Sequence, residues 1–381
     1  MRLSAKIACV VAIANLTGCT SLSHLFRSDT KTPPAALVEF KSSMTVRTAW
    51  SSSVGDSGIY VFSPALSDGG LFLASADGTV ARLDAVTGKA VWRINAGMPL
   101  TAGVGIDLQT VVVAGEKGEV LAFDHDGKLR WKAQATSEIL SSPAVGQGLV
   151  IVRSGDDRIS AFDEDSGEKK WSIQRTSPPL TLRITPGIAI EGTAAFVALP
   201  GGKLLAIALN NGAPVWEATV GEPRGATELE RVTDTAGMPI VSGSDICAVA
   251  YQGRVACFDV SSGEPRWAKK LSSEVGIGID EHSVYAADDA GGVNAFARDT
   301  GTSVWRNKTL AYRRLTAPVP FNRAVLVGDV EGYVHFLSRE DGAMLARTAI
   351  GSSPIVGTPL VVGSNVIIQT QSGAVVALTT E

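Results

Sequence analysis

The stretch DGTVARLDAVTGKAVW (residues 77–92) decides the fold, because versions of it recur along the whole chain. It predicts a strand (TVARLD), a tight turn (AVTG) and a second strand that ends in Trp. The later copies are KGEVLAFDHDGKLRW, DDRISAFDEDSGEKKW, GGKLLAIALNNGAPVW, QGRVACFDVSSGEPRW, GGVNAFARDTGTSVW, EGYVHFLSREDGAMLA and SGAVVALTTE. A fixed period of this kind indicates a repeat architecture.

Two sets of positions measure the repeat and agree on eight copies. The large apolar residue of the first strand recurs at steps of 40, 39, 45, 51, 38, 41 and 41 residues, at Leu83, Phe123, Phe162, Ile207, Phe258, Phe296, Leu337 and Leu378. In six copies a turn glycine stands four residues before a Trp, at Trp92, Trp131, Trp171, Trp216, Trp267 and Trp305. The seventh copy has Ala346 at the Trp position, and the eighth ends at Glu381 before its turn.

The incomplete eighth copy predicts how the repeats close. One further Trp, Trp50, precedes the first full copy, so we expect residues 47–50 to supply the outer strand that the eighth copy lacks. A period near 40 with four short strands per unit is typical of a propeller blade. The sequence therefore predicts an all-β fold: an eight-bladed β-propeller of four-stranded antiparallel blades, closed by N- and C-terminal strands that share one blade. The Trp rings are expected to pack between blades.

Composition fits a globular β protein and excludes a nucleic-acid-binding surface. The chain of 381 residues has 40 Gly, 45% hydrophobic residues and only 19% charged residues, with a formal net charge of −4. Without Arg2 and Lys6 the 34 basic residues become 32 against 38 acidic ones, a net charge of −6. No basic cluster interleaved with aromatic residues is present.

The first residues predict an export signal and a lipid anchor. Arg2 and Lys6 precede a short apolar run that ends in Leu-Thr-Gly-Cys at residues 16–19. This resembles the lipobox of bacterial lipoproteins, so we expect residues 1–18 to be a signal peptide and Cys19 to be lipidated. Thr20 after the Cys favours the outer membrane, with the protein facing the periplasm. The alternative is ordinary secretory cleavage that leaves a free thiol.

Residues 19–44 are predicted to be the lipidated Cys and a flexible tether, and residues 45–381 to be the propeller. The tether sequence is mixed in character and contains Pro. A short amphipathic helix lying on the membrane is the other possibility for this segment.

Two repeats are longer than the others, and their extra residues are the candidate binding surface. The 45-residue step places them in RTSPPLTLRITPGIAI (175–190) and the 51-residue step in GEPRGATELERVTDTAG (221–237). Both segments follow a Trp strand and precede the next inner strand, so both should emerge on one face of adjacent blades, where insertions often bind partners. The candidate residues are Leu180, Leu182, Arg183, Glu228, Glu230, Arg231 and Asp234. The alternative is that these segments bind nothing and that the two leucines cap the core.

Residue patterns typical of catalysis, metals and cofactors are absent from the sequence. The four His residues occupy unrelated repeat positions, none with a metal-ligand spacing: His24, His125, His282 and His335. No nucleophile elbow, phosphate-binding loop or dinucleotide fingerprint is present. Paired acids such as Asp156-Asp157 fall in turns, where Asp favours local backbone hydrogen bonds. We therefore expect no enzyme activity, no cofactor and no metal.

Two cysteines, Cys247 and Cys257, fall on the two arms of a predicted hairpin that turns at Gln252-Gly253. A two-residue turn would direct them to opposite faces, whereas a three-residue turn would place them opposite each other. Cys257 also takes the position that small alanines occupy in other repeats. We favour two small buried thiols over a disulfide.

The repeats resemble the PQQ-type propeller unit, with its G-x-x-x-A-x-D…TG-x-x-x-W pattern, which two protein families share. Quinoprotein dehydrogenases use the ring to hold a quinone cofactor and calcium, and often carry adjacent cysteines at the site. This chain has no adjacent Cys pair and is too short for the insertions of those enzymes. The second family is BamB, the lipoproteins of the outer-membrane β-barrel assembly (BAM) machinery, and that resemblance runs from the lipobox to the final strand.

The resemblance to BamB implies a non-catalytic scaffold. Proteins of that family bind the periplasmic POTRA domains of BamA, act with other BAM complex members, and are thought to help deliver or orient unfolded outer-membrane protein precursors. By the same resemblance, Leu180 and Leu182 would bury against the partner while Arg183 and Asp234 fix its register. Ala236 stands where the family pattern has a second acidic residue. The other readings are a periplasmic PQQ-dependent dehydrogenase-like or other ligand-binding propeller, and a scaffold for another envelope complex.

Overall fold

The computed structural model describes residues 32–176 and 178–381. The chain divides into two compact units, Met1–Pro33 and Pro34–Glu381. Of the first unit only Thr32 and Pro33 are described, and they have no regular secondary structure. The predicted signal peptide, Cys19 and the early part of the predicted tether lie outside the described residues.

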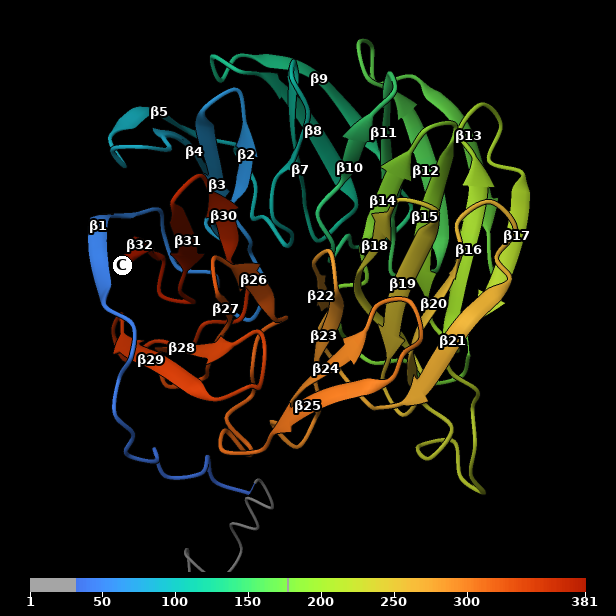
Figure 1. The fold of residues 1–381 in the computed structure, drawn as a ribbon. Coiled ribbons are helices and arrows are strands. Elements are labelled where there is room, and N and C mark those ends of the chain that lie inside the picture. Colours follow the sequence, from blue (N-terminus) through green and yellow to red (C-terminus); the bar gives the residue numbers. More distant parts are fainter. Residues whose placement is uncertain (1–31, 177) are drawn as a thin grey trace, which may run out of the picture. The chain divides into compact units, whose positions relative to one another are not determined.

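Residues 34–381 form eight four-stranded antiparallel sheets arranged as the blades of a β-propeller (Figure 1), as predicted. Blades 1 to 4, each from its inner to its outer strand, are β2 (Ala65–Ser67), β3 (Gly70–Ala74), β4 (Thr79–Asp84), β5 (Ala90–Asn95); β6 (Gly105–Ile106), β7 (Thr110–Ala114), β8 (Glu119–Asp124), β9 (Leu129–Gln134); β10 (Ala144–Gly146), β11 (Leu149–Arg153), β12 (Arg158–Asp163), β13 (Lys169–Gln174); and β14 (Ile188–Glu191), β15 (Ala194–Leu199), β16 (Lys203–Ala208), β17 (Pro214–Thr219). Blades 5 to 8 are β18 (Thr235–Ser242), β19 (Asp245–Ala250), β20 (Arg254–Asp259), β21 (Pro265–Lys270); β22 (Ile277–Ile279), β23 (Ser283–Ala287), β24 (Val293–Ala297), β25 (Ser303–Asn307); β26 (Val319–Phe321), β27 (Ala324–Gly328), β28 (Tyr333–Ser338), β29 (Met344–Ala349); and β30 (Leu360–Val362), β31 (Asn365–Gln369), β32 (Ala374–Thr380), β1 (Val46–Ser53).

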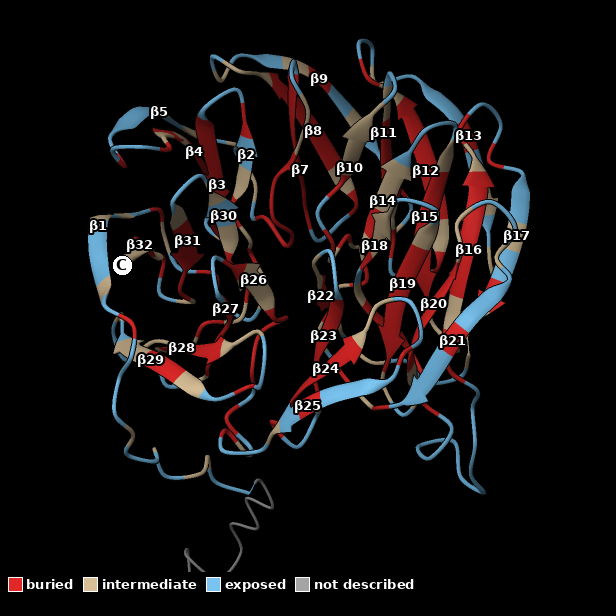
Figure 2. Cartoon of the chain, in the orientation of Figure 1, coloured by how far each residue is buried: buried red, intermediate tan, exposed pale blue. Residues whose placement is uncertain are grey.

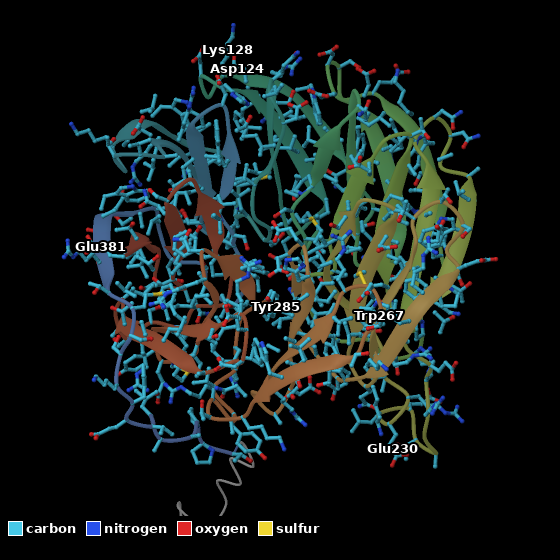
Figure 3. The ribbon with its side chains drawn as sticks, viewed as in Figure 1. Asp124, Lys128, Glu230, Trp267, Tyr285 and Glu381 are labelled. Carbon is cyan, nitrogen blue, oxygen red and sulfur yellow. A yellow bond between two sulfur atoms is a disulfide. The ribbon has the colours of Figure 1, made fainter. Side chains whose placement is uncertain are left out.

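The two ends of the propeller sequence share blade 8, which confirms the predicted closure. Strand β1 pairs antiparallel with the last strand, β32, and sets Trp50 opposite Ala377. Just beyond these strands the backbone N–H of Glu381 donates to the carbonyl of Thr45 at 3.0 Å. Figure 3 shows Glu381 beside β1. The ring is therefore closed by hydrogen bonds between its first and last strands.

The hydrophobic core of the molecule lies between the blades. The second strand of each blade is largely buried, and β7, with the sequence TVVVA, is buried at every position, because both faces of each sheet pack against neighbouring sheets. Eight clusters of buried apolar side chains each join two adjacent blades, including blade 8 with blade 1. Figure 2 shows largely buried middle strands such as β12 and β16, and largely exposed outer strands such as β21 and β25.

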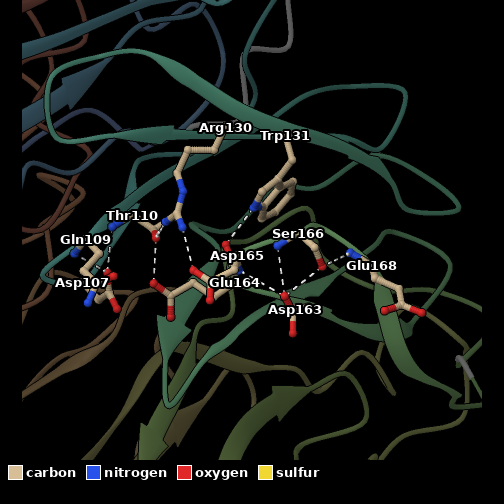
Figure 4. Close-up of polar contacts among 10 residues, drawn as sticks. All are labelled: Asp107, Gln109, Thr110, Arg130, Trp131, Asp163, Glu164, Asp165, Ser166 and Glu168. Atoms are coloured by element: carbon tan, nitrogen blue, oxygen red, sulfur yellow. Dashed lines mark hydrogen bonds and ion pairs between the residues drawn. The ribbon is translucent and has the colours of Figure 1, made fainter.

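The Trp residues join neighbouring blades, as the repeat pattern predicted. The indole N–H of Trp131 donates to the carbonyl of Glu164 in the next blade at 2.7 Å (Figure 4). Its ring covers the turn glycine Gly167, where a Cβ atom would lie 2.7 Å from the ring. Because Gly167 has a φ of 73°, glycine suits both the turn and the close approach of the ring. Five further indole groups donate to the next blade in the same way: Trp92, Trp171, Trp216, Trp267 and Trp305.

The joint between blades 7 and 8 has Ala346 in place of Trp, and residues 34–44 cover it. Met44 is buried in the cluster that contains Ala346. The N–H of Ser43 donates to the carbonyl of Leu345 at 2.9 Å, and Arg347 donates to the carbonyl of Val38 at 3.1 Å. We call residues 34–44 the N-terminal strap. The predicted tether of residues 19–44 did not anticipate these contacts with the outer strand of blade 7.

The expectation of two free thiols is wrong, because Cys247 and Cys257 form a disulfide. The turn between β19 and β20 contains three residues, 251–253, rather than two, and Gln252 within it has a φ of 48°. The three-residue turn sets Cys247 opposite Cys257 with their Cα atoms 4.0 Å apart. The disulfide therefore links the second and third strands of blade 5.

The antiparallel order gives the ring two different faces. All eight segments that join one blade to the next lie on one face, together with the turns between second and third strands; we call it the connection face. The turns between first and second strands and between third and fourth strands lie on the other face. Among the residues that the structure describes, no helix is long and apolar enough to cross a membrane.

Candidate partner-binding site

The two long segments that the sequence singled out both lie on the connection face, as expected. The first connection, residues 175–187, joins β13 to β14, and the second connection, residues 220–234, joins β17 to β18. They therefore flank blade 4. A cavity of about 420 Å³ lies between them, with Pro178 of the first connection and Pro223 of the second in its lining.

The cavity between the connections carries paired charges. Arg175 forms an ion pair with Glu217, and the Lys203 ammonium lies 3.7 Å from the same carboxylate. These three side chains line the cavity together with Leu199 and Gly201. The two cations share one carboxylate. The lining of the cavity is otherwise mainly apolar, so these three side chains supply most of its charge.

The leucines of the first connection differ in exposure. Leu180 is 47% exposed, whereas Leu182 is half-buried. Two residues further on, Ile184 packs against the apolar cluster between blades 5 and 6. The connection is therefore anchored at Ile184 and presents Leu180 to solvent. An exposed apolar side chain on an anchored loop suits contact with a partner.

Asp234 lies beneath the first connection and not at the surface, where a partner would contact it. It is only 3% exposed. One carboxylate oxygen accepts a hydrogen bond from the Leu182 N–H at 2.5 Å, and the other accepts one from the Gly201 N–H at 3.1 Å. Burial raises the pKa of the Asp234 carboxyl, while these two hydrogen bonds and nearby Arg153 act in the opposite direction. The carboxylate thus binds the first connection to blade 4.

Arg183 is held by residues from two other connections. Its guanidinium binds both carboxylate oxygens of Glu138, with Nη1–Oε1 at 3.0 Å and Nη2–Oε2 at 2.9 Å. It also lies 5.8 Å from the ring centre of Tyr60. Glu138 belongs to the segment between β9 and β10, and Tyr60 to the segment between β1 and β2. The first connection therefore reaches segments that precede blades 1 and 3.

Sequence reasoning missed Glu138 and Tyr60. Each lies in a segment of ordinary length, in a different repeat from Arg183, and no local pattern marks it. The acidic and aromatic partners of Arg183 can be identified only when the positions of the blades around the propeller are known. A signal was available only for Arg183 itself, through the added length of its segment.

The second connection ends in a short turn that has its own internal contacts. The Glu230 carboxylate accepts hydrogen bonds from the N–H groups of Ala226 and Thr227 at 2.8 and 3.1 Å, and the Glu230 N–H donates to the Thr227 hydroxyl at 3.3 Å. The reciprocal bonds between Thr227 and Glu230 form a capping box. The hydrogen bond from the Thr227 N–H is the main reason that the pKa of Glu230 lies below its ordinary value. Figure 3 shows Glu230 on a loop that projects beyond the strands.

The remaining predicted residues of the second connection pair with each other. Glu228 and Arg231 lie 3.7 Å apart, and Arg231 also donates to the carbonyl of Gly225 at 3.1 Å. Leu229 between them is 73% exposed and was not singled out from the sequence. The structure thus brings Leu182 and Asp234 together, whereas Glu228 and Arg231 lie on the separate projecting turn. Cys19 lies outside the described residues.

Comparison with known proteins identifies the family. The chain matches the family described as "Outer membrane protein assembly factor BamB" over residues 76–307 and 289–381. A curated protein of that name from Bordetella pertussis is 46% identical over 362 residues, which cover 95% of this chain and 93% of the relative. The chain belongs to the BamB family. Its BamB relative from Burkholderia pseudomallei is 41% identical and covers 98% of this chain and 97% of its own length.

Solved structures agree with the assignment of the fold. The crystal structure of BamB from Moraxella catarrhalis superposes with a TM-score of 0.81 at 27% identity, over 88% of this chain and all of that one. Quinohemoprotein alcohol dehydrogenase from Comamonas testosteroni gives a TM-score of 0.67 at 13% identity. At that identity the second likeness shows only that BamB and the dehydrogenase share the propeller architecture.

Ala236, where the resemblance to BamB implied a second acidic residue, lies inside the protein. Ala236 is buried in the cluster between blades 5 and 6, together with Cys247 and Ile277. A side chain at this position in this BamB-family chain points into the core and away from solvent. Asp234 therefore supplies the carboxylate on which the first connection depends.

Proposed function

We propose that this BamB-family chain is a non-catalytic scaffold of the BAM complex that binds the periplasmic POTRA domains of BamA and assists the assembly of β-barrel proteins into the outer membrane. The observation that carries the proposal is the first connection, an anchored segment that presents the exposed Leu180 on the connection face. The names of the curated relatives, outer membrane protein assembly factors, support the same process.

In this proposal Leu180 is the apolar anchor of the interface. A Leu side chain buried against a partner contributes about 1.5–3 kcal/mol, and a few such side chains dominate many interfaces. Leu229, which is also exposed, would extend the contact on the second connection. Arg183, Glu228 and Arg231 already have partners within the chain, so they would set polarity around the apolar anchors rather than donate unpaired charge.

We expect Leu180→Glu to weaken binding to the purified POTRA domains of BamA by about tenfold or more, because it removes an apolar anchor and adds a charge. Leu108→Glu is the matched control: Leu108 is equally apolar and is 76% exposed, but it lies in the turn between β6 and β7 on the opposite face. Affinity would be measured by surface plasmon resonance, and folding by circular dichroism. Equal affinities for the two variants would rule out the first connection as the binding surface.

The proposed position in the cell follows from the N-terminal residues. We propose lipidation at Cys19, retention at the outer membrane and exposure to the periplasm, where the chain would meet BamA, other BAM members and unfolded barrel precursors. Metabolic labelling with palmitate tests the anchor: a Cys19→Ala chain should lose the label and leave the membrane fraction. A labelled Cys19→Ala chain would refute this assignment.

The absence of catalytic activity is tested directly. The dehydrogenase alternative requires a quinone cofactor and calcium, so the purified chain should be incubated with both and assayed for dye reduction with alcohols and sugars. We expect no stoichiometric binding and no reduction above the level of a denatured control. A tight complex with dye-reducing activity would replace the scaffold by an enzyme.

A further inference from the structure

The first connection is fixed at its end by hydrogen bonds and is restricted near its start by two prolines. At its end, the hydroxyl of Ser141 donates to the carbonyl of Pro186 at 2.6 Å, and the N–H of Gly187 donates to the carbonyl of Gly237 at 2.9 Å. Pro178 and Pro179 restrict the backbone near its start. The span from Leu180 to Arg183 between these points has no strand partner, so side chains must determine its conformation.

Two carboxylates bind this span. One oxygen of the Asp234 carboxylate accepts a hydrogen bond from the N–H of Leu182. The other accepts one from the N–H of Gly201, in the turn between β15 and β16. Glu138 binds the Arg183 guanidinium through two parallel hydrogen bonds. Hydrogen bonds to charged groups contribute more than neutral ones, and the paired Arg–carboxylate geometry also fixes direction. The two carboxylates come from different connecting segments and act on neighbouring residues of one span.

We infer that Asp234 and Glu138 are positioning residues, which hold residues 180–183 in the binding conformation before the partner arrives. The inference rests on the proposed function, because it concerns the same surface. Asp234 then acts through the Leu182 amide and does not touch the partner, in agreement with its burial. Glu138 orients Arg183 so that the guanidinium stacks on Tyr60 and leaves Leu180 exposed.

A positioning role has a kinetic signature that a direct contact does not have. If the span is released, only a fraction of molecules holds the binding conformation, and the apparent association rate falls by that fraction. Once the complex has formed, its contacts are unchanged, so the dissociation rate stays the same. Loss of a direct contact instead speeds dissociation, as most interface mutations do.

The test uses the full mature chain with Asp234→Ala and Glu138→Gln, compared with Glu168→Gln. Glu168 is the matched control, because its exposed carboxylate pairs only with Lys170 among the ion pairs of the described residues and lies in the turn between β12 and β13, on the opposite face. Hydrogen exchange would be followed by mass spectrometry in peptides covering residues 178–187 and, as an internal reference, residues 110–114 of β7. Association and dissociation rates would be measured with the POTRA domains of BamA.

We expect exchange in residues 178–187 to become about tenfold faster or more in Asp234→Ala, since a charge-assisted hydrogen bond is lost, with no change in β7. The association rate should fall by a similar factor, the dissociation rate should stay unchanged, and Glu168→Gln should behave as wild type. Glu138→Gln, a surface change, covers the case in which Asp234→Ala unfolds.

Three results would overturn the inference or separate it from the proposed function. Unchanged exchange at residues 178–187 in both variants means that the carboxylates do not hold the span. Faster dissociation at a normal association rate means that they contact the partner directly. If the wild-type chain does not bind POTRA domains, the proposed function fails, and the exchange comparison alone decides whether the two carboxylates position the span.

Discussion

At the residue scale, a buried charged network joins blade 7 to the segment between β25 and β26, which contains Arg313. The Asp329 carboxylate accepts Arg313 Nε at 2.6 Å and lies 2.8 Å from His335 Nε2. Arg313 also donates to the carbonyl of Ala35 in the N-terminal strap at 2.8 Å. All three side chains are buried. A buried charge is tolerated when it is paired and hydrogen-bonded, and here one network joins the strap to the blade.

His335 should make the stability of the chain depend on pH. Burial lowers the pKa of His335 in the folded state, although its bond to Asp329 acts in the opposite direction. At acid pH the folded chain therefore binds fewer protons than the unfolded chain. The contribution of His335 to stability is fully present above its unfolded pKa of about 6.5 and is lost as pH falls through its lower pKa in the folded state. The slope from this group is at most about 1.4 kcal/mol per pH unit.

Urea unfolding followed by Trp fluorescence between pH 8 and pH 5 measures this effect (the interval spans the unfolded pKa of about 6.5). At the alkaline end of this interval His335→Gln should have a lower free energy of unfolding than wild type, and the difference in free energy between the two chains should shrink as pH falls. Parallel profiles for the two chains would show that His335 does not contribute.

At the scale of elements, the repeat pattern predicted most strands. In every blade the apolar residues indicate the buried strands, and the glycines indicate the turns between them. The predicted strand TVARLD, residues 79–84, is β4, and the predicted outer strand at residues 47–50 lies within β1. The turn of the β19–β20 hairpin could not be predicted in the same way. Gln252-Gly253 has the composition of a two-residue turn, but Tyr251 also lies in the turn, so it contains three residues.

The candidate site was predictable only in part, for a related reason. Extra chain length identified the two connections, and apolar character identified Leu180. The buried Asp234 carboxylate accepts a hydrogen bond from the backbone N–H of Leu182, and a pattern of side chains in the sequence cannot predict a bond to a backbone group. The pairing of Arg183 with Glu138 joins residues 45 positions apart in two different repeats, so only the closed ring brings them together.

The disulfide predicts a measurable contribution of the β19–β20 hairpin. Cys247 and Cys257 are ten residues apart, and closing a loop of this size stabilises a fold by about 2–3 kcal/mol in the chain-entropy treatment. Cys247→Ala combined with Cys257→Ala should lower the free energy of unfolding by that amount in urea titrations. Reductant should destabilise the wild-type chain to a similar degree and leave the double variant unchanged. A wild-type chain insensitive to reductant would contradict this expectation.

At the scale of the whole molecule, the N-terminal strap replaces a joint that the repeat lacks. Blades 7 and 8 meet without a Trp, and Met44 fills the cluster around Ala346. The strap also explains why β29 is more buried than the other outer strands, as Figure 2 shows. The ring is therefore closed by two devices, the shared blade 8 and the strap beside it.

Met44→Ala should lower the free energy of unfolding by about 2–5 kcal/mol, since it removes a buried side chain and leaves a cavity between two blades. Val38→Ala is the control within the same strap, because Val38 is exposed and its carbonyl contact with Arg347 remains. Urea titration with Trp fluorescence separates them. Equal midpoints for the two variants would show that the strap does not support the joint.

Blade 8 draws its outer strand from the beginning of the propeller sequence and its other three strands from the end. During synthesis β1 therefore has no pairing partner until β32 has been made, and this sheet is the last that the growing chain can complete. A chain that stopped before Ala374 would leave β1 and β31 without their common neighbour. It would also uncover the apolar clusters on both flanks of that sheet, so premature termination even a few residues from the end should yield an aggregation-prone product.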